Sequence, residues 1–128
     1  MVGLVLSGAG KMKTCSDFDQ IFLHRDPVDF RKSINGLSAI VNDSLEKSCY
    51  QNHLFVFCNK HRDKLKILYW DNTGFCLWYK RLEEDKFKWP KKHNDFCIEL
   101  NKEQMNWLLR GLDISKLTPH LNKEYSDI

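Results

Sequence analysis

The sequence predicts an α+β fold, in which an antiparallel sheet of about five to six strands has two helices packed on one of its faces. Short apolar and aromatic runs follow one another between residues 54 and 89. Asn, Asp and Gly separate these runs, as is typical of strands joined in hairpins. Two other stretches repeat apolar residues every three or four positions, which indicates helices with one buried side each. A chain of 128 residues is long enough for one such domain with its own core.

The predicted domain covers residues 16–117. Residues 1–15 form an apolar and small-residue leader that we expect to be poorly ordered, and residues 118–128 form a polar tail interrupted by proline. The apolar run of the leader is too short for a signal peptide or a membrane span, so no membrane partner is expected. Within the domain, the first strand is expected at residues 19–26, and Pro27 ends it.

The first helix is expected to begin at Asp29, whose carboxylate can cap free backbone N–H groups of the first turn. Apolar residues then follow on one face of this helix, at Phe30, Ile34, Leu37, Val41 and Leu45. Arg31 and Lys32 occupy the first turn, where the helix dipole disfavours cations. Two interpretations stay open. Either these cations and the free N–H groups bind a phosphate, or Asp26 and Asp29 neutralise them in solvent.

The central region is predicted to be an antiparallel meander of four strands, at residues 54–58, 65–70, 75–82 and 86–89. If residues 71–74 close the second hairpin, residues opposite one another have numbers that sum to about 145. The face of this hairpin that is the better core face carries Leu65, Ile67, Tyr69, Cys76, Trp78 and Lys80. The other face is apolar near the turn and basic, with a tyrosine, at the far end; it carries Lys64, Lys66, Leu68, Trp70, Phe75, Leu77, Tyr79 and Arg81.

The domain is expected to close with a last strand at residues 96–100 and a second helix. Phe96, Ile98 and Leu100 alternate and are expected to point inward. Asn101 and Gln104 then have the spacing of a capping box. The apolar face of the helix consists of Met105, Leu108, Leu109 and Leu112, with Gly111 near its end.

The net charge of +3 is unevenly distributed, because ten Lys or Arg and five acidic residues lie between Lys60 and Lys92. This excess permits nucleic-acid binding without requiring it. The candidate phosphate ligands are Arg31, Lys32, Lys60, Arg62, Lys64, Lys66, Lys80, Arg81 and Lys88. At residues 86–89, lysines alternate with aromatic residues, which suits phosphate contact with base stacking but is also typical of a half-buried edge strand.

The five cysteines include no C-x-x-C pair. Cys58, Cys76 and Cys97 lie in strand-like runs, where a free cysteine behaves as a small buried hydrophobic residue. Cys58 and His61 have the spacing of metal ligands, but a second such pair is missing. We therefore expect reduced thiols, no metal or other cofactor, and a cytoplasmic location.

Several blocks of the sequence resemble the TnpB (Orf2-like) accessory protein of the insertion sequence sixty-six family of bacterial transposons. They are LFVFCNKHRDKLKILYWD and GFCLWYKRLEEDKFKWP in the central region, PVDFRKSINGLSAIV upstream and LNKEQMNWLLRGLDI downstream. The resemblance covers about residues 18–114. It implies an accessory role in transposition, while a separate, larger transposase of the same element carries out strand transfer. It provides no agreed catalytic residues.

The residues themselves give no sign of an enzyme. A glycine-rich phosphate loop, H-E-x-x-H and G-x-S-x-G are absent, and acidic residues stand mostly beside Lys or Arg. We expect no catalytic residues and no small-molecule substrate.

Two functions are compatible with a non-enzymatic accessory protein. The first is phosphate contact with transposon ends through the nine cations, which would weaken steeply with salt. The alternative is an adaptor that docks on the transposase, or on another accessory protein, without touching DNA. Such an interface would depend on apolar anchors. A third hypothesis is that this copy is the remnant of a decayed transposon.

Overall fold

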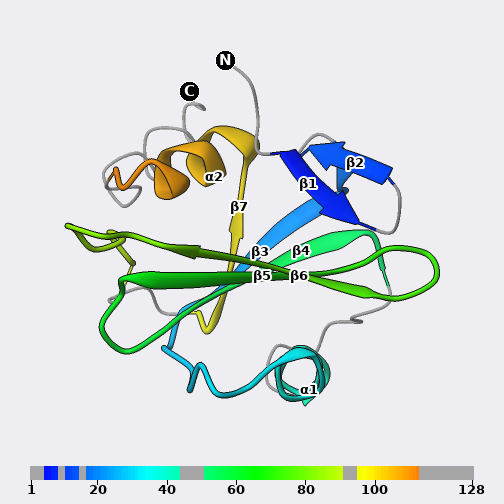
Figure 1. Ribbon diagram of the computed structural model, residues 1–128, viewed down its shortest axis with the longest axis horizontal. Coiled ribbons are helices and arrows are strands. Elements are labelled where there is room, and N and C mark those ends of the chain that lie inside the picture. Colours follow the sequence, from blue (N-terminus) through cyan, green and yellow to red (C-terminus); the bar gives the residue numbers. More distant parts are fainter. Residues whose placement is uncertain (1–4, 9–10, 15–16, 44–50, 91–94, 113–128) are drawn as a thin grey trace.

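The computed structural model describes residues 5–8, 11–14, 17–43, 51–90 and 95–112. It has an α+β fold with a main sheet of five strands, in the order β6-β5-β4-β3-β7, and a separate hairpin, β1-β2 (Figure 1). The strands are β1 (Val5–Gly8), β2 (Lys11–Thr14), β3 (Gln20–His24), β4 (His53–Cys58), β5 (Lys64–Trp70), β6 (Phe75–Arg81) and β7 (Cys97–Leu100). The helices are α1 (Ile34–Asp43) and α2 (Lys102–Leu109).

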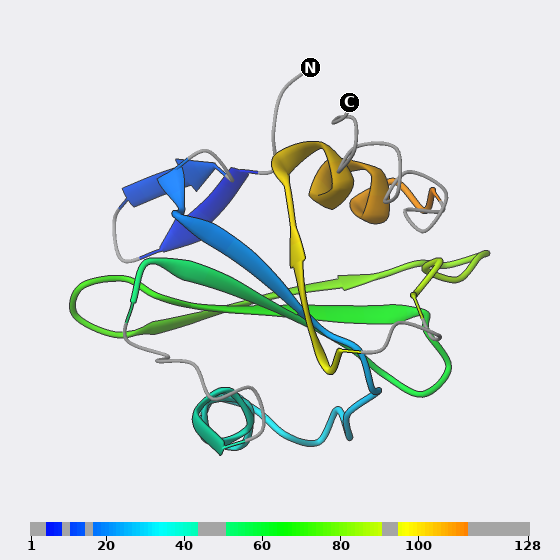
Figure 2. The same cartoon turned by 180° about the vertical axis from the view of Figure 1, so that it is seen from behind.

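The main sheet is mixed, so the expectation of a wholly antiparallel sheet is wrong. β3 pairs with β4 in parallel, with Ile21 opposite Leu54, whereas the β4-β5, β5-β6 and β3-β7 pairs are antiparallel. The parallel pair arises because α1 lies between β3 and β4 in the chain and crosses one face of the sheet (Figure 2). The antiparallel meander is confirmed for β4, β5 and β6.

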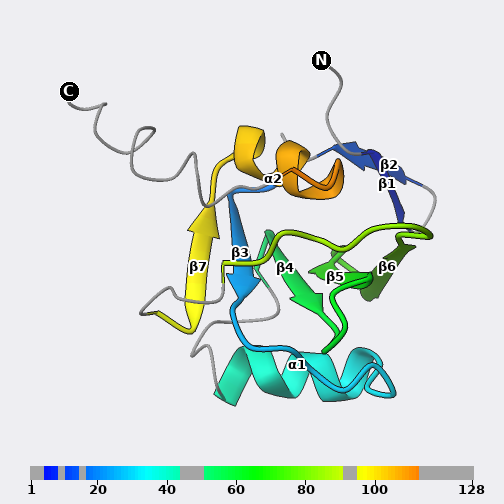
Figure 3. The ribbon, with the colours of Figure 1, turned by 90° about the vertical axis from the view of Figure 1, so that its left-hand side faces the viewer.

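The two helices lie on opposite faces of the sheet, so the expectation that both pack on one face is also wrong (Figure 3). On the α1 side, Leu37 and Val41 pack in a core with Phe22, Phe55, Phe57 and Leu68. On the α2 side, Met105, Leu108 and Leu109 pack in a core with Ile21, Leu23, Leu54, Val56, Cys58, Leu65, Ile67 and Tyr69. Every residue of β4 is buried, and a strand buried on both faces needs cover on both.

The β5-β6 hairpin has the register predicted from the sequence. Lys64 lies opposite Arg81 and Trp70 lies opposite Phe75, so the numbers of paired residues sum to 145. The assignment of its two faces is confirmed as well. Leu65, Ile67, Tyr69, Cys76 and Trp78 contribute to the α2-side core, and Leu68, Phe75 and Leu77 contribute to the α1-side core.

The predicted fourth strand of the meander is not a strand, because residues 86–89 cross the α2 side of the sheet without pairing in it. Phe87 and Trp89 are buried there. The Phe87 N–H donates to the carbonyl of Arg62 at 2.7 Å. The indole Nε1–H of Trp89 donates to the carbonyls of Arg25 (2.9 Å) and His24 (3.2 Å). The alternation of lysine and aromatic residues therefore belongs to an extended segment on the core, and it leaves neither ring free to stack on a base.

The closing strand and helix form as predicted, with differences at Phe96 and at Leu112, which was expected on the apolar face of the helix but lies beyond α2 and is exposed. The Asn101 side chain accepts the Gln104 N–H at 2.7 Å, and the Gln104 side chain accepts the Asn101 N–H at 2.9 Å, which completes the capping box. Gly111, just after α2, has a φ of +79°, the left-handed conformation that favours glycine. Phe96 was expected to point inward but is 57% exposed, with the Arg25 guanidinium 4.5 Å from its ring centre.

The segment expected as a leader contains the β1-β2 hairpin, in which Val5 lies opposite Thr14 and Gly8 opposite Lys11. This hairpin forms its own sheet, apart from the main sheet. The expected tail, residues 118–128, lies outside the described residues, and so does Leu45.

Candidate nucleic-acid interface

The nine candidate phosphate ligands fall into three places. Five lie at the open end of the β5-β6 hairpin on the α1 side or in the loop that covers it: Arg31, Lys32, Lys64, Lys66 and Arg81. We call these five the basic surface. Lys60 and Arg62 lie in the β4-β5 turn. Lys80 and Lys88 lie on or beside the α2 side of the sheet.

A hydrogen-bonded lysine joins the two parts of the basic surface. The Lys66 ammonium donates to the carbonyls of Phe30 (3.0 Å) and Lys32 (2.9 Å), and it lies 4.8 Å from the centre of the Phe30 ring. Burial lowers the pKa of Lys66. This ammonium fixes the segment before α1 against β5, so that cations far apart in the sequence lie together.

The start of the first helix differs from the expectation. Helix α1 begins at Ile34, and Asp29 lies in a preceding turn in which the Lys32 N–H donates to the Asp29 carbonyl at 3.0 Å. Asp29 is therefore not the helix cap, and Arg31 and Lys32 are not in the first helical turn. The premise of the phosphate hypothesis, that these two cations lie in the first turn of the helix with its free N–H groups, is therefore wrong.

The Asp29 carboxylate instead neutralises Arg31, as the second interpretation expected. It accepts the Arg31 N–H at 2.9 Å and the Arg31 guanidinium at 2.6 Å. These hydrogen bonds lower the pKa of Asp29 from 3.8 to about 2. Asp26 pairs with Arg25 at 3.0 Å and does not contribute. The Arg31 side chain is 91% exposed, so an anion from solvent can reach it.

Other cations also have carboxylate neighbours. Arg81 pairs with Glu83 at 2.9 Å and Lys64 lies 4.0 Å from Asp63. Away from the basic surface, Lys88 lies 3.5 Å from Asp85. The basic surface therefore combines five cations with the three carboxylates Asp29, Asp63 and Glu83, which leaves it positive.

Lys80 and Arg62 have surroundings that the sequence did not reveal. The Lys80 ammonium donates to the Leu109 carbonyl at 2.8 Å, at the C-terminal end of α2, where the helix dipole favours a cation. Arg62 has a φ of +62°, and its Nε is buried without a hydrogen-bond partner. For Lys80 a signal was available, because the hairpin register already placed it on the core face.

The β4-β5 turn is held by Asn59, which is buried. Its Nδ2 donates to the Asp63 carboxylate at 2.7 Å, and its Oδ1 accepts the Lys64 N–H at 3.0 Å. This hydrogen bond from Asn59 is the main reason that the pKa of Asp63 is lowered. Lys60 is exposed at the tip of this turn.

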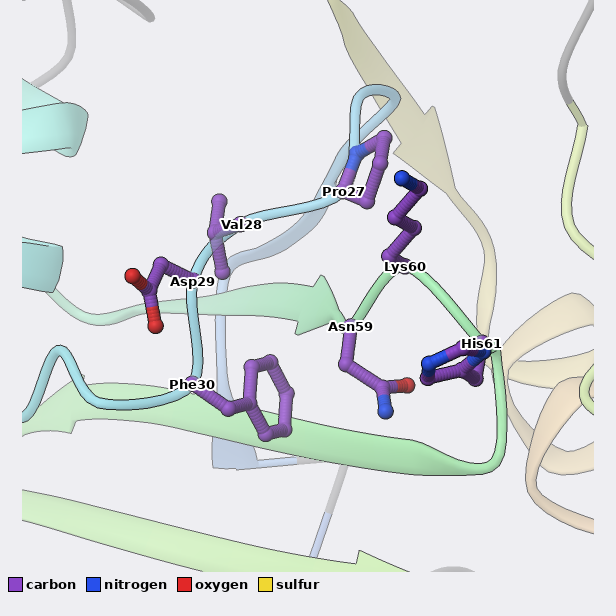
Figure 4. Close-up of a pocket in the computed structure, with 7 residues that line it drawn as sticks. All are labelled: Pro27, Val28, Asp29, Phe30, Asn59, Lys60 and His61. Carbon is purple, nitrogen blue, oxygen red and sulfur yellow. The ribbon is translucent and has the colours of Figure 1, made fainter.

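Two shallow pockets meet at Phe30. One, of about 420 Å³, is lined by Phe30, Lys64, Lys66 and Tyr79. The other, of about 530 Å³, is lined by Pro27, Val28, Asp29, Phe30, Asn59, Lys60 and His61. Figure 4 shows the side chains of Phe30 and Asn59 in the space between residues 27–30 and the β4-β5 turn, with the Asp29 carboxylate on the other side of its loop. Phe30 was expected on the buried face of a helix, so its place between two pockets was missed.

The part of the chain that the structure describes contains no group of three or more His, Cys, Asp or Glu side chains that could hold a metal ion. None of its helices is long and apolar enough to cross a membrane.

The chain is similar to known proteins over most of its length. The model of the family described as "IS66 Orf2 like protein" matches residues 19–119. An uncharacterised protein of Sinorhizobium fredii, y4jC, is 37% identical over 98 residues, which cover 77% of this chain and 83% of the relative. A second uncharacterised protein of the same organism, y4hO, is 29% identical over 94 residues, covering 73% and 81%. No solved structure matches the chain. The chain therefore belongs to the IS66 Orf2-like family, whose members are accessory proteins of IS66 transposons.

Proposed function

We propose that this protein is a non-catalytic accessory protein for transposition of a bacterial insertion sequence, and that its basic surface binds the phosphates of DNA. Membership of the IS66 Orf2-like family supports the role in transposition. The observation that carries the DNA contact is the pair of hydrogen bonds from Lys66 to the carbonyls of Phe30 and Lys32. These bonds hold the backbone of residues 30–32 against Lys66, on the face of the hairpin that also carries the cross-strand pair Lys64–Arg81.

The cations of this surface have different roles in the proposal. Arg31, Lys32, Lys64 and Arg81 are the phosphate ligands, and Lys60 extends the surface across the second pocket. Lys66 positions the loop, because carbonyl oxygens already occupy its ammonium. The ion pairs Arg31–Asp29 and Arg81–Glu83 are exposed, and exposed pairs are weak in water, so phosphates can compete for both guanidinium groups. The Lys88 and Lys80 side chains take no part.

The proposal is tested by titrating the protein with a duplex from the end of its element and with a scrambled duplex, across a salt series. We expect the logarithm of the binding constant to fall linearly with the logarithm of salt concentration, with a slope of about −3 to −5 if four or five phosphates are neutralised. The double variant Lys64→Glu/Arg81→Glu should lose most of this binding and most of the slope.

A matched control keeps the same change in net charge but places it elsewhere. The double variant Lys86→Glu/Lys88→Glu changes two exposed cations of the segment that crosses the α2 side. It should retain most of the binding if the basic surface is the contact. Equal loss in both double variants would mean that only net charge matters. If the unchanged protein bound neither the duplexes nor their separated strands at low salt, the DNA contact would be contradicted.

One observation favours a second function, an adaptor that docks on the transposase. Pro27, Val28 and Phe30 give the larger pocket a mainly apolar lining, which suits an apolar anchor of a protein partner. Binding of purified transposase that changes little with salt and is lost in Val28→Asp, while DNA is not bound, would support this function instead.

A further inference from the structure

We propose that Tyr79 forms a stacking platform for an unpaired base, so that the basic surface takes single-stranded nucleic acid in preference to a duplex. This inference rests on the proposed function, because it uses the same cations. To the proposed function it adds single-stranded nucleic acid as the class of ligand and Tyr79 as the residue that stacks on an unpaired base.

Tyr79 is the aromatic residue of β6 that is exposed. It lies within β6, yet its side chain is 49% exposed. On the same face of the strand, Leu77 packs in the α1-side core. In the described part of the chain, two other large apolar side chains are exposed to a similar degree: Phe96, which faces the Arg25 guanidinium, and Leu112, which follows α2. Tyr79 is thus the exposed aromatic residue that borders a pocket containing cations.

The Tyr79 ring contacts the Phe30 ring but is not stacked on it. Phe30, the other aromatic residue of this pocket, has its ring centre 6.4 Å from that of Tyr79, and the two rings are tilted by 52°, so they are not stacked on each other. The Lys66 ammonium lies over the Phe30 ring. A planar group that enters this pocket therefore meets the tyrosine as its available aromatic surface.

Cations flank this ring at a distance suited to a nucleotide backbone. Tyr79 lies directly opposite Lys66, and the next pair on the same face is Lys64 opposite Arg81. Neighbouring residues on one face of a strand are about 6.5–7 Å apart, within reach of a phosphate attached to a stacked nucleoside. An aromatic platform beside a track of cations is the arrangement by which proteins bind single strands without sequence preference.

The geometry favours an unpaired base over a paired one. In a duplex the faces of each base are covered by its neighbours, so a ring on a sheet surface has no base face to stack on. Tyr79 is held by a strand and its contacts to the sheet, so it cannot insert between base pairs as a flexible loop can. A base in a duplex would first have to be unstacked from its neighbours, which costs free energy. A free end or an opened segment of a strand presents its base faces without this cost.

The test measures the binding of three fluorescent ligands by anisotropy at one low salt concentration: a deoxythymidine oligonucleotide, the corresponding uridine oligonucleotide and a duplex of the same length. We compare Tyr79→Ala, Tyr79→Trp, and Lys64→Glu/Arg81→Glu with the unchanged protein. Tyr79→Ala should weaken single-strand binding about tenfold or more and change duplex binding less than about twofold. Tyr79→Trp should retain single-strand binding, because it keeps a stacking surface.

The outcomes separate this inference from the proposed function. If Tyr79→Ala binds every ligand like the unchanged protein while Lys64→Glu/Arg81→Glu loses them all, the phosphate contact stands and the stacking platform is overturned. If the unchanged protein binds none of the three, both are overturned. If Tyr79→Ala weakens binding of the uridine and the deoxythymidine oligonucleotides to the same degree, the site accepts any single strand. If it weakens binding of one of them alone, the site is specific for RNA or for DNA accordingly. Circular dichroism and a thermal melt of Tyr79→Ala show whether the variant keeps the fold.

Discussion

The Lys66 ammonium lies 3.0 Å from the carbonyl oxygen of Phe30 and 2.9 Å from that of Lys32, so one side chain of β5 holds the loop that precedes α1. Replacing Lys66 with Met keeps most of the length of the side chain and removes both hydrogen bonds. Since hydrogen bonds to charged groups contribute about 1.5–3 kcal/mol when buried and less when solvent has access, we expect Lys66→Met to lower the free energy of unfolding by about 1 kcal/mol. Urea unfolding measures this change.

Lys64→Met is the matched control for this prediction, because Lys64 lies on the same face of the same strand without a backbone carbonyl as a partner. It should change the free energy of unfolding by less than about 0.5 kcal/mol. Hydrogen exchange should also rise at Lys32 in Lys66→Met but not in Lys64→Met. Equal stability of the two variants would contradict the anchoring role of Lys66.

The pKa of Asp29 provides a second prediction. Hydrogen bonds from Arg31 lower it from 3.8 to about 2. We expect carboxyl NMR resonances to show Asp29 titrating near pH 2 in the unchanged protein and at a higher pH in Arg31→Gln. In that variant the pKa stays below 3.8, because the backbone N–H of residue 31 keeps its hydrogen bond to the carboxylate. Because the folded-state pKa is the lower one, the pair stabilises the fold above the unfolded pKa, and this contribution disappears as the pH falls through the folded pKa.

The stability difference between the unchanged protein and Arg31→Gln should be present at neutral pH and vanish only below about pH 2. A difference that grew as the pH fell, or an Asp29 that titrated alike in both proteins, would show that Arg31 does not hold this carboxylate.

The sequence was sufficient for the β5-β6 hairpin and insufficient for the relation of the helices to the sheet. The hairpin could be predicted because alternation of period two and a four-residue turn fix both the register and the two faces. The run His53–Cys58 has no such alternation. A wholly apolar strand is compatible with cover on either face, so the pattern could not reveal that α1 crosses to form a parallel pair, nor that α2 covers the other face.

The candidate site was predictable only as a set of charges. Periodicity places Lys64 and Arg81 on one face, and the structure agrees. The hydrogen bond from Lys80 to a helix end and those from Lys66 to the loop depend on backbone atoms that are distant in the sequence, so residue types give no sign of them. Trp89 illustrates the same limit, because its alternation with lysine resembles a strand while its indole in fact closes the α2 side of the core.

Trp89 gives a third prediction, since its indole N–H donates to two backbone carbonyls while the ring is 6% exposed. Trp89→Phe keeps most of the apolar volume and leaves both carbonyls without this donor, so we expect a loss of about 1–2 kcal/mol in the free energy of unfolding. Trp89→Ala also leaves a cavity and should cost about 3–5 kcal/mol. Chemical unfolding of both variants measures these two losses. If both losses were small, Trp89 would be exposed, as on an edge strand, and not buried in the core.

Cys58 provides a fourth prediction, which concerns reactivity. Its thiol is fully buried, its Sγ lies 3.1 Å from the Asn59 carbonyl, and burial raises its pKa from 9.0 to about 12. Because the thiolate is the reactive form, we expect iodoacetamide at pH 8 to modify Cys58 only when the protein unfolds. Mass spectrometry of peptides should show Cys76, on the edge strand and partly exposed, modified first in the native protein. In denaturant the two cysteines should react at similar rates, which controls for their intrinsic reactivity. Equal modification of both cysteines in the native protein would mean that the end of β4 opens readily. The β4-β5 turn, which carries Lys60, would then not be held in a fixed position next to the basic surface.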